Sequence, residues 1–184
     1  MIYYTADLHF LHQNIIKYCS RPFHDIQEMS EKLISNWNIR VTPSDVVYII
    51  GDVHMGDKSH IPHHVNQLNG KITLIKGNHD LHRSGNLWNQ FSQSKISEYY
   101  DDLYIEDLGV KLYLRHEPKM DWVANEQSQY HLTGHVHNSW RRLGDIINVG
   151  VDVWDYRPVT LTELLAAPQS SFSASAPTSF TTTP

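Results

Sequence analysis

Short apolar runs alternate with amphipathic stretches along the first 160 residues of the chain. Five runs rich in Ile, Val and Tyr predict buried or half-buried strands, at 2–6, 46–50, 72–75, 110–114 and 130–133. A sixth strand is predicted over 146–151. Each of the first five runs ends directly at a group of polar residues. Strand ends are where open α/β sheets place their functional sites, so these polar groups are the first candidates for chemistry.

The amphipathic stretches predict helices. Residues 25–28 have the form of a capping box, and the apolar residues that follow recur on one helical face as far as Trp37. This helix is expected to end before Pro43. A shorter helix is predicted over 62–68 and a third within 86–96. The alternation of strand and helix predicts a layered α/β domain.

Composition favours one soluble cytoplasmic domain. The chain has 184 residues, 40% of them hydrophobic and 19% charged, and no apolar run approaches the ~20 residues needed to span a bilayer. The first residues show no signal-peptide pattern, and the single cysteine, Cys19, allows no internal disulfide. We therefore expect no membrane partner. The pattern leaves the oligomeric state open.

The net charge of the chain bears on which kinds of molecule it can bind. The net charge of −5 argues against extended nucleic-acid binding, which depends on Lys and Arg neutralising phosphates. A small phosphorylated substrate remains compatible, because bound metal ions supply their own local positive charge.

The last nineteen residues differ in composition from the rest of the chain. Residues 166–184 contain no charged side chain and are rich in Ser, Thr, Ala and Pro. Such a segment buries too little apolar surface to offset the entropy of ordering it. The sequence therefore predicts a domain over 1–165 and a flexible tail over 166–184. In the alternative interpretation, Phe172 and Phe180 make the tail a docking segment.

The five polar groups contain residue types that bind metals. They are Asp7 with His9, then Asp52, then Asn78-His79-Asp80, then His116, and finally His135 with His137. In an extended segment, side chains two residues apart point the same way, so a carboxylate and an imidazole can meet at one cation. Each group alone also fits an ordinary turn or surface loop. All five in this order predict a centre that holds two metal ions.

In this order, each after an apolar run, the groups resemble the calcineurin-like metallophosphoesterase superfamily over about residues 1–160. The segments 7–23 and 148–158 are similar to a small, mostly uncharacterised bacterial and phage branch of that superfamily. The resemblance implies an α/β sandwich of two mixed β-sheets flanked by helices.

The resemblance also implies a role for each residue. Seven positions would bind metal: Asp7, His9 and His137 the first ion, Asn78, His116 and His135 the second, and Asp52 both. His79 would donate a proton to the leaving group, with Asp80 as its orienting partner. Asn78 would also contact the substrate.

Two further residues are candidates for substrate binding. His12 and Arg21 follow the first polar group closely, so they are expected to border the pocket. The planar guanidinium of Arg21 can bind two phosphate oxygens. An ordinary structural role for Arg21, next to a proline, stays open.

The implied function is hydrolysis of a phosphate mono- or diester by a metal-activated hydroxide, with a nucleotide as one candidate substrate. The nitrogen and oxygen ligands lack a thiolate and suit Mn²⁺, with Fe, Zn²⁺ or Ni²⁺ as alternatives. Two other functions stay open. One is a catalytically silent protein-binding scaffold, and the other is a nuclease of the same superfamily, which would call for a basic groove or an added domain.

Overall fold

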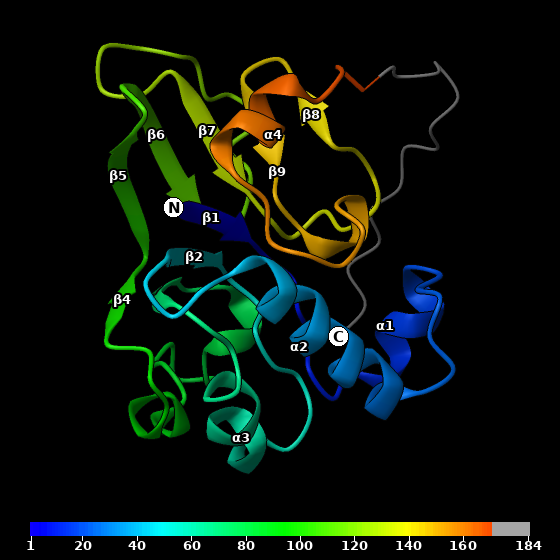
Figure 1. Ribbon diagram of the computed structural model, residues 1–184. Helices are drawn as coiled ribbons and strands as arrows, with labels where there is room; N and C mark the ends of the chain where they lie inside the picture. Colours follow the sequence, from blue (N-terminus) through cyan, green and yellow to red (C-terminus); the bar gives the residue numbers. More distant parts are fainter. Residues whose placement is uncertain (171–184) are drawn as a thin grey trace.

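Neighbouring residues of the first strand enter two different hydrophobic cores. In β1 (Ile2–Thr5), Tyr3 packs into one core and Tyr4 into the other, because successive side chains of a strand point to opposite faces. The computed structural model describes residues 1–170. Within them, two sheets stack in layers, with helices outside (Figure 1).

The first sheet is parallel throughout, with strand order β1-β2-β3-β4. Its other strands are β2 (Val46–Ile50), β3 (Lys71–Ile75) and β4 (Glu98–Tyr100). The three strands predicted over 2–6, 46–50 and 72–75 are therefore found, with shifts of one residue at two of their ends. β4 was not predicted, because three residues with alternating exposure give a weak signal.

The second sheet is mixed, with strand order β5-β6-β7-β9-β8. It contains β5 (Asp102–Asp107), β6 (Val110–Arg115), β7 (Tyr130–Thr133), β8 (Arg142–Leu143) and β9 (Ile146–Asn148). β6, β7 and β9 run parallel, while β5 and β8 pair antiparallel at the two edges. The predicted class, two sheets flanked by helices, is confirmed, although only the second sheet is mixed.

Two cores hold the layers together. One lies between the first sheet and α2 (Ile26–Arg40), where Leu33 and Trp37 belong to the same buried cluster as Val47 and Leu74. The other lies between the sheets, where Ile50 meets residues of β6, β7 and β9 together with α4 (Leu161–Ala166). Both faces of the first sheet are thus covered, which explains why its strands read as continuous apolar runs.

The helices match the predicted pattern in part. The carboxylate of Asp25 caps α2 by accepting from the backbone N–H groups of Gln27 and Glu28, as the capping box predicts. Glu28, however, accepts from the N–H of His24 rather than from that of Asp25. The helix predicted over 62–68 is the shorter α3 (Ile61–Val65), and the stretch 86–96 contains only a 3₁₀ segment, Asn89–Gln93. A further short helix, α1 (Gln13–Tyr18), follows the first polar group.

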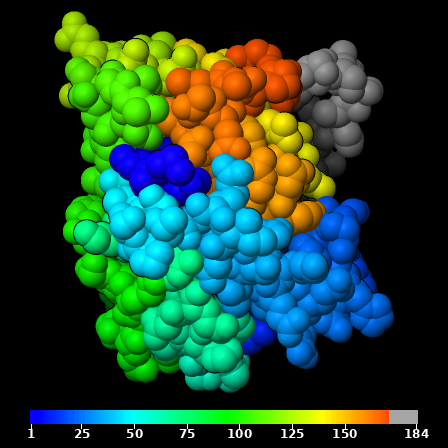
Figure 2. Space-filling view, viewed as in Figure 1, coloured from blue at the N-terminus to red at the C-terminus, as the bar shows by residue number. Residues whose placement is uncertain are grey.

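Contacts with the domain continue through the last described residues (Figure 2). The Ser170 hydroxyl accepts from the backbone N–H groups of Arg141 and Arg142, and the Gln169 amide oxygen accepts from that of Gly144. The boundary after residue 165 stays a prediction, but these contacts extend five residues beyond it. Most of the predicted tail, with Phe172 and Phe180, lies outside the described residues. Among the helices of residues 1–170, none combines the length and apolarity that crossing a membrane requires.

Candidate metal centre

The ends of the strands bring the predicted residues together. β1, β2 and β3 are parallel, so the loops that follow them leave the same edge of the sheet. The loops after β1 and β2 are joined by hydrogen bonds from Asp7 N to Gly51 O and from His9 N to Asp52 O, each 3.0 Å. The loop after β7 joins the same edge, because the His135 N–H donates to the Asp7 carboxylate at 2.9 Å.

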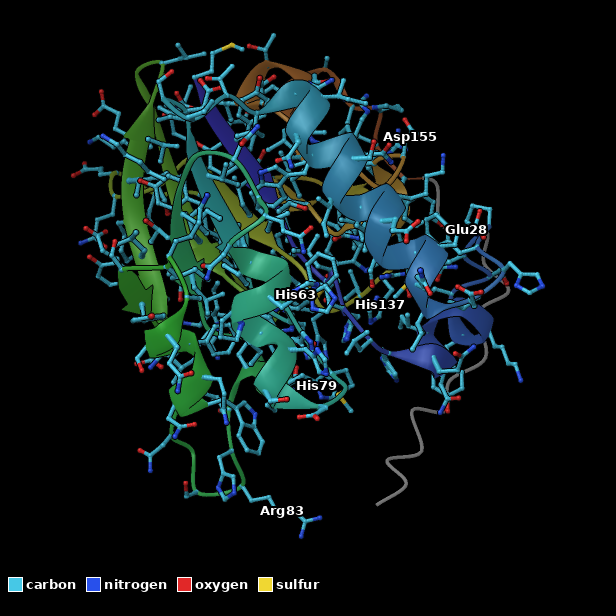
Figure 3. The ribbon with its side chains drawn as sticks, turned by 60° about the horizontal axis from the view of Figure 1, so that its bottom comes forward. Glu28, His63, His79, Arg83, His137 and Asp155 are labelled. Atoms are coloured by element: carbon cyan, nitrogen blue, oxygen red, sulfur yellow. The ribbon has the colours of Figure 1, made fainter. Side chains whose placement is uncertain are left out.

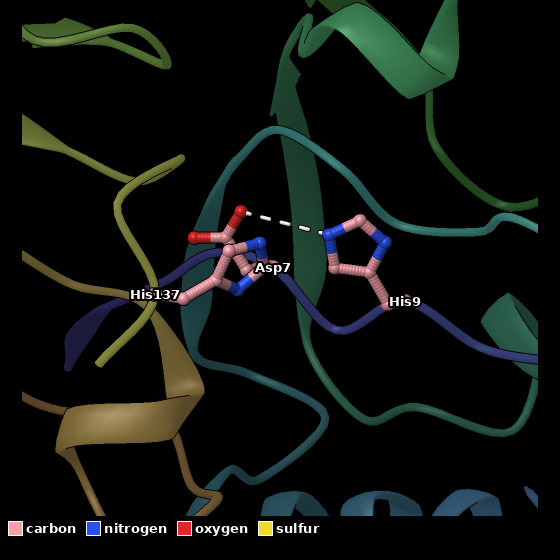
Figure 4. Close-up of side chains that lie close together, drawn as sticks. All are labelled: Asp7, His9 and His137. Atoms are coloured by element: carbon pink, nitrogen blue, oxygen red, sulfur yellow. Dashed lines mark ion pairs between the residues drawn. The ribbon is translucent and has the colours of Figure 1, made fainter. Parts of the chain in front are cut away.

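The first group of candidate ligands contains Asp7, His9 and His137. Each offers one ligand atom, and these atoms lie within 4.8 Å of one another. Figure 4 shows the three side chains converging, with the Nε2 atom of His9 at 3.9 Å from the Oδ1 atom of Asp7. Asp7 and His9 are buried and His137 is half-buried.

The second group contains Asp52, His116 and His135, whose ligand atoms also lie within 4.8 Å of one another. The Oδ1 atom of Asn78 lies 3.2 Å from the Nδ1 atom of His135. The Nδ1 atom of His116 faces the carbonyl oxygen of Ile50 at 2.8 Å and must donate to it. The Nε2 atom of His116 is therefore the one that can bind a metal when the ring is neutral.

One carboxylate oxygen joins the two groups. The Oδ2 atom of Asp52 lies 3.5 Å from the Nε2 atom of His9 and 3.3 Å from the Nε2 atom of His116. The other oxygen, Oδ1, accepts from the backbone N–H of His79 at 2.9 Å. Asp52 thus stands between the two sets of ligands, with its side chain almost fully buried.

The donor atoms fit a pair of divalent metal ions. Within residues 1–170, both ring nitrogens of His9 and the Nε2 atom of His116 are buried without a hydrogen-bond partner. Leaving a buried polar atom unpaired costs about 1–3 kcal/mol, so these nitrogens call for another partner. The two groups offer only nitrogen and oxygen, which suits divalent transition metals.

The pKa values of the candidate ligands also favour a site for metal ions. Burial raises the pKa of Asp7 to about 6. Burial alone would lower the pKa of His116, but the neighbouring carboxylates of Asp52 and Asp7 outweigh this effect and raise the pKa to about 9. Protons therefore balance the buried carboxylates in the metal-free protein. Metal binding would displace them, since ligands bind metals in their deprotonated forms.

Backbone strain is concentrated at the same residues. Five of the seven implied ligands have positive φ angles, a conformation uncommon outside glycine: Asp7 at 57°, His9 at 52°, Asp52 at 57°, His135 at 71° and His137 at 48°. Such conformations are sustained only where the surrounding structure enforces them, and they cluster at functional sites. This pattern is a conformational observation that supports a functional role.

The comparisons with known proteins place the chain in a family without settling a reaction. No family model matches. An uncharacterized protein of Methanocaldococcus jannaschii, MJ1445, is 36% identical over 172 residues, which cover 87% of this chain and 86% of that protein. The chain belongs to the same family as MJ1445. No activity accompanies that family assignment.

One solved structure shares the arrangement of elements over most of its length. A protein of unknown function from Aquifex aeolicus, AQ665, superposes with a TM-score of 0.68 at 25% identity, covering 89% of this chain and 97% of that one. An archaeal phosphodiesterase overlaps less closely, with a TM-score of 0.49 at 16% identity over 81% of each chain. The latter likeness is too slight to bear on the function of this family.

The structure corrects the predicted role of Asp80. Its two carboxylate oxygens accept from the backbone N–H groups of Asp52, Val53 and Gly77 at 2.8–2.9 Å. No hydrogen bond joins Asp80 to the His79 ring within the described chain. Asp80 is fully buried, so it holds the loop that carries Asp52 rather than orienting the proton donor. The prediction that it orients His79 is wrong, because its oxygens are taken by backbone donors.

The structure also corrects the predicted role of Arg21. The side chain is only 3% exposed, and its guanidinium donates to Asp152 and to the carbonyl oxygens of Asp7 and Leu8. None of these donors is free for a substrate phosphate. The structural alternative left open for Arg21 therefore holds, although its partners lie at the candidate metal centre.

His79 and His12 lie beside the ligands. The Nε2 atom of His79 is 3.9 Å from the Oδ2 atom of Asp52, and the side chain is 34% exposed. The ring of His12 lies 5.2 Å from that of His9 and is half-buried. Figure 3 shows His79 and His137 toward the middle of the view, whereas Arg83 projects outward at its lower edge. The roles of His79 and His12 stay predictions.

Sequence reasoning missed Asp152 and Lys58. Asp152 accepts from both His137 and Arg21, and it lies in the 148–158 segment that contributed to the resemblance without a role of its own. Lys58 donates from its ammonium group to the carbonyl oxygens of His54 and His79. The contacts of Asp152 with Arg21 and of Lys58 with His79 join residues 131 and 21 positions apart, so they have no local sequence signal.

Proposed function

We propose that this protein hydrolyses a phosphate ester with two divalent metal ions held by the candidate metal centre. The position of Asp52 carries this proposal. One of its oxygens lies within 3.5 Å of a nitrogen from each ligand group, so a single carboxylate can bind to both ions. Two metal ions about 3.5–4 Å apart are typical of phosphoryl-transfer sites.

The two proposed metal ions and the exposed side of the centre would have different roles in the reaction. Bound cations would neutralise phosphate oxygens and lower the pKa of a water molecule held at the site. Asn78 and His135 are exposed, whereas Asp7, His9, Asp52 and His116 are buried, so the centre opens to solvent on the side of the second group. A substrate would enter there, within reach of the Asn78 amide.

His79 is the proposed proton donor. Its ring is close to Asp52 but partly exposed, so it can reach a leaving oxygen without binding a metal itself. A protonated Nε2 atom would give its proton to that oxygen as the ester bond breaks, a contribution typically worth ~10²–10⁴-fold. His12, half-buried beside His9, is a further candidate contact for the substrate.

Mn²⁺ is the proposed native metal, and Fe, Zn²⁺ and Ni²⁺ are compatible with the same donor atoms. The proposed substrate is a small phosphorylated molecule, such as a nucleotide, cleaved as a monoester or a diester. A cytoplasmic location is part of the same proposal.

Metal titration combined with a substrate screen tests the proposal. Protein stripped of metal is titrated with Mn²⁺, and the number of bound ions is measured by calorimetry. The loaded protein is then assayed on nitrophenyl phosphate mono- and diesters, nucleotides, cyclic nucleotides, phosphosugars and phosphopeptides. We expect two ions per chain and hydrolysis of at least one ester class. A stoichiometry of one or less at saturation refutes the shared pair of ions, and two ions without hydrolysis favour the scaffold alternative.

A further inference from the structure

Arg21 is a buried cation at the edge of the candidate metal centre. Its Nε and Nη2 atoms donate to the two carboxylate oxygens of Asp152 at 2.7 and 3.0 Å. Nη2 also donates to the carbonyl oxygen of Asp7 at 2.7 Å, and Nη1 donates to that of Leu8 at 3.0 Å. The guanidinium therefore fixes the backbone at Asp7, the first implied ligand.

Asp152 extends this contact to a second ligand. Its Oδ2 atom lies 2.9 Å from the Nδ1 atom of His137, and its side chain is 1% exposed. A carboxylate in this position accepts a hydrogen bond from Nδ1–H, so the proton of a neutral His137 stays on Nδ1 and leaves Nε2 unprotonated. Ligand histidines in metalloproteins are commonly held in this way, and the partner fixes both the tautomer and the ring orientation.

We infer that Arg21 and Asp152 are positioning residues for the first metal ion. The inference rests on the proposed function, because it concerns how that site binds its ion. Through one buried ion pair, the two residues fix the backbone of Asp7 and the ring of His137, which are two of the three ligands in the first group. Within residues 1–170, no hydrogen bond joins the side chains of this pair to Asp52, His116 or His135.

A purely structural ion pair is a weaker explanation. Burying two charges costs several kcal/mol in desolvation, and apolar residues of similar size often serve a core equally well. Every hydrogen bond from the Arg21 guanidinium to oxygen ends at Asp152 or at the segment that carries Asp7. The two residues of the pair are 131 positions apart, and they join the segments proposed to hold the first ion.

The nearby thiol does not offer a better account. Cys19, His137 and Asp152 also have potential ligand atoms within 4.8 Å of one another. Both oxygens of Asp152, however, already accept from the Arg21 guanidinium. A metal cation bound there would lie beside another fixed positive charge, so this third group is a poor cation site.

Mn²⁺ binding to an Asp152→Asn variant tests the inference. The amide keeps the shape but loses the charge that holds both Arg21 and the Nδ1 proton of His137. We expect one of the two ions to bind about 10–100-fold more weakly, as is typical when the partner of a ligand histidine is lost. The other ion should bind as in the wild type. Electron paramagnetic resonance supplies a second readout, because a coupled Mn²⁺ pair should give way to an isolated ion.

A second background identifies which ion is lost. His135→Ala removes a ligand of the second group only, so it should leave the first ion bound. Adding Asp152→Asn in that background should weaken the remaining ion. Arg21→Lys, which keeps the charge but not the planar fork, should weaken the same ion to a smaller extent.

Glu163→Gln is the matched control. Glu163 is also a carboxylate shared by two partners, Arg40 at 2.6 Å and Arg157 at 2.9 Å, but it lies on α4 and outside the centre. It should lower stability and leave both ions bound. Thermal midpoints of the metal-free proteins show whether each variant is folded, and Arg21→Lys carries the test if Asp152→Asn is not.

The outcomes are separable. If the wild type binds two ions and both Asp152→Asn and Arg21→Lys bind them with unchanged affinity, the positioning role is refuted while the proposed function stands. Equal weakening of both ions in the variants also refutes it. If the wild type itself binds no second ion, the proposed function fails before this inference is reached.

Discussion

Removing the ring of His79 should separate proton donation from metal binding. The backbone of this residue is held independently of its side chain. Its N–H donates to the Oδ1 atom of Asp52 at 2.9 Å, and its carbonyl oxygen accepts from Lys58 at 3.1 Å. Because both bonds survive in His79→Ala, Asp52 and the neighbouring Asn78 should keep their places. Metal content should therefore match that of the wild type.

The structure also bounds the cost to stability. The His79 ring is about one-third exposed, and its aromatic contact is an edge-on approach to His9 with centroids 5.4 Å apart. Such a contact is worth about 0.5–1.5 kcal/mol, so the fold should tolerate its loss. The effect on catalysis should be larger. Loss of a general acid costs ~10²–10⁴-fold, which corresponds to about 2.7–5.4 kcal/mol in the activation barrier.

The assay compares leaving groups. Values of kcat/KM are measured with Mn²⁺ for a series from alkyl phosphates to nitrophenyl phosphates. The loss in His79→Ala should be largest for alkyl esters, whose leaving oxygen needs a proton, and smallest for nitrophenyl esters. His63→Ala, an exposed histidine on α3, is the control and should change neither class. Equal losses along the series would show that His79 positions the phosphate rather than donating a proton.

Three other perturbations address the metals, the electrostatics and the end of the domain. Asp52→Asn should weaken Mn²⁺ binding at both sites, whereas His137→Ala should weaken it at one, and calorimetry that finds the same pattern for both contradicts the shared carboxylate. Burial raises the pKa of Glu163, but hydrogen bonds from Thr160 and the two nearby arginines outweigh it and hold this pKa at about 2 in place of 4.5. The stabilising contribution of ionised Glu163 is therefore present above pH 4.5 and is lost as the pH falls toward 2. After allowance for solvent screening, Glu163→Gln should lower the free energy of unfolding by about 1–2 kcal/mol at pH 7 and by little near pH 2. Urea titrations at several pH values measure this difference. Ending the chain after Leu165 should cost about 2–4 kcal/mol in lost hydrogen bonds, measured against a chain that ends after Ser170, and equal stability would show that those bonds are not used.

The sequence predicts the part of this fold that local pattern encodes. The strands of the first sheet are buried on both faces, so they appear as unbroken apolar runs, and α2 shows a capping residue followed by an amphipathic face. β5 was missed because it lies at a sheet edge and alternates exposed and half-buried residues that include four charged or aromatic side chains. β8 has only two residues, which is too short for any periodicity.

The candidate site also contains residues that the sequence predicts and others that it does not. The seven implied ligands could be named because each follows a strand, and parallel strands bring their carboxyl ends to one edge. The partners of those ligands could not be named. Asp80 contacts three backbone N–H groups, and Arg21 reaches Asp152 across 131 positions of sequence. Their positions near a motif favoured a catalytic or substrate-binding role for both side chains, whereas their actual contacts depend on how distant loops pack.

The positive φ angles link the fold of the chain to its candidate metal centre. The backbone turns sharply at Asp7, Asp52 and His135 because each strand must end and redirect its chain toward a common point. Asp and His are among the non-glycine residues that tolerate this conformation best. Gly51, itself at φ 84°, adds a spatial requirement, because a Cβ atom there would overlap the ring of His116. The residues proposed to bind metals are therefore also those that permit the backbone geometry, so the same short motifs would serve both metal binding and chain reversal.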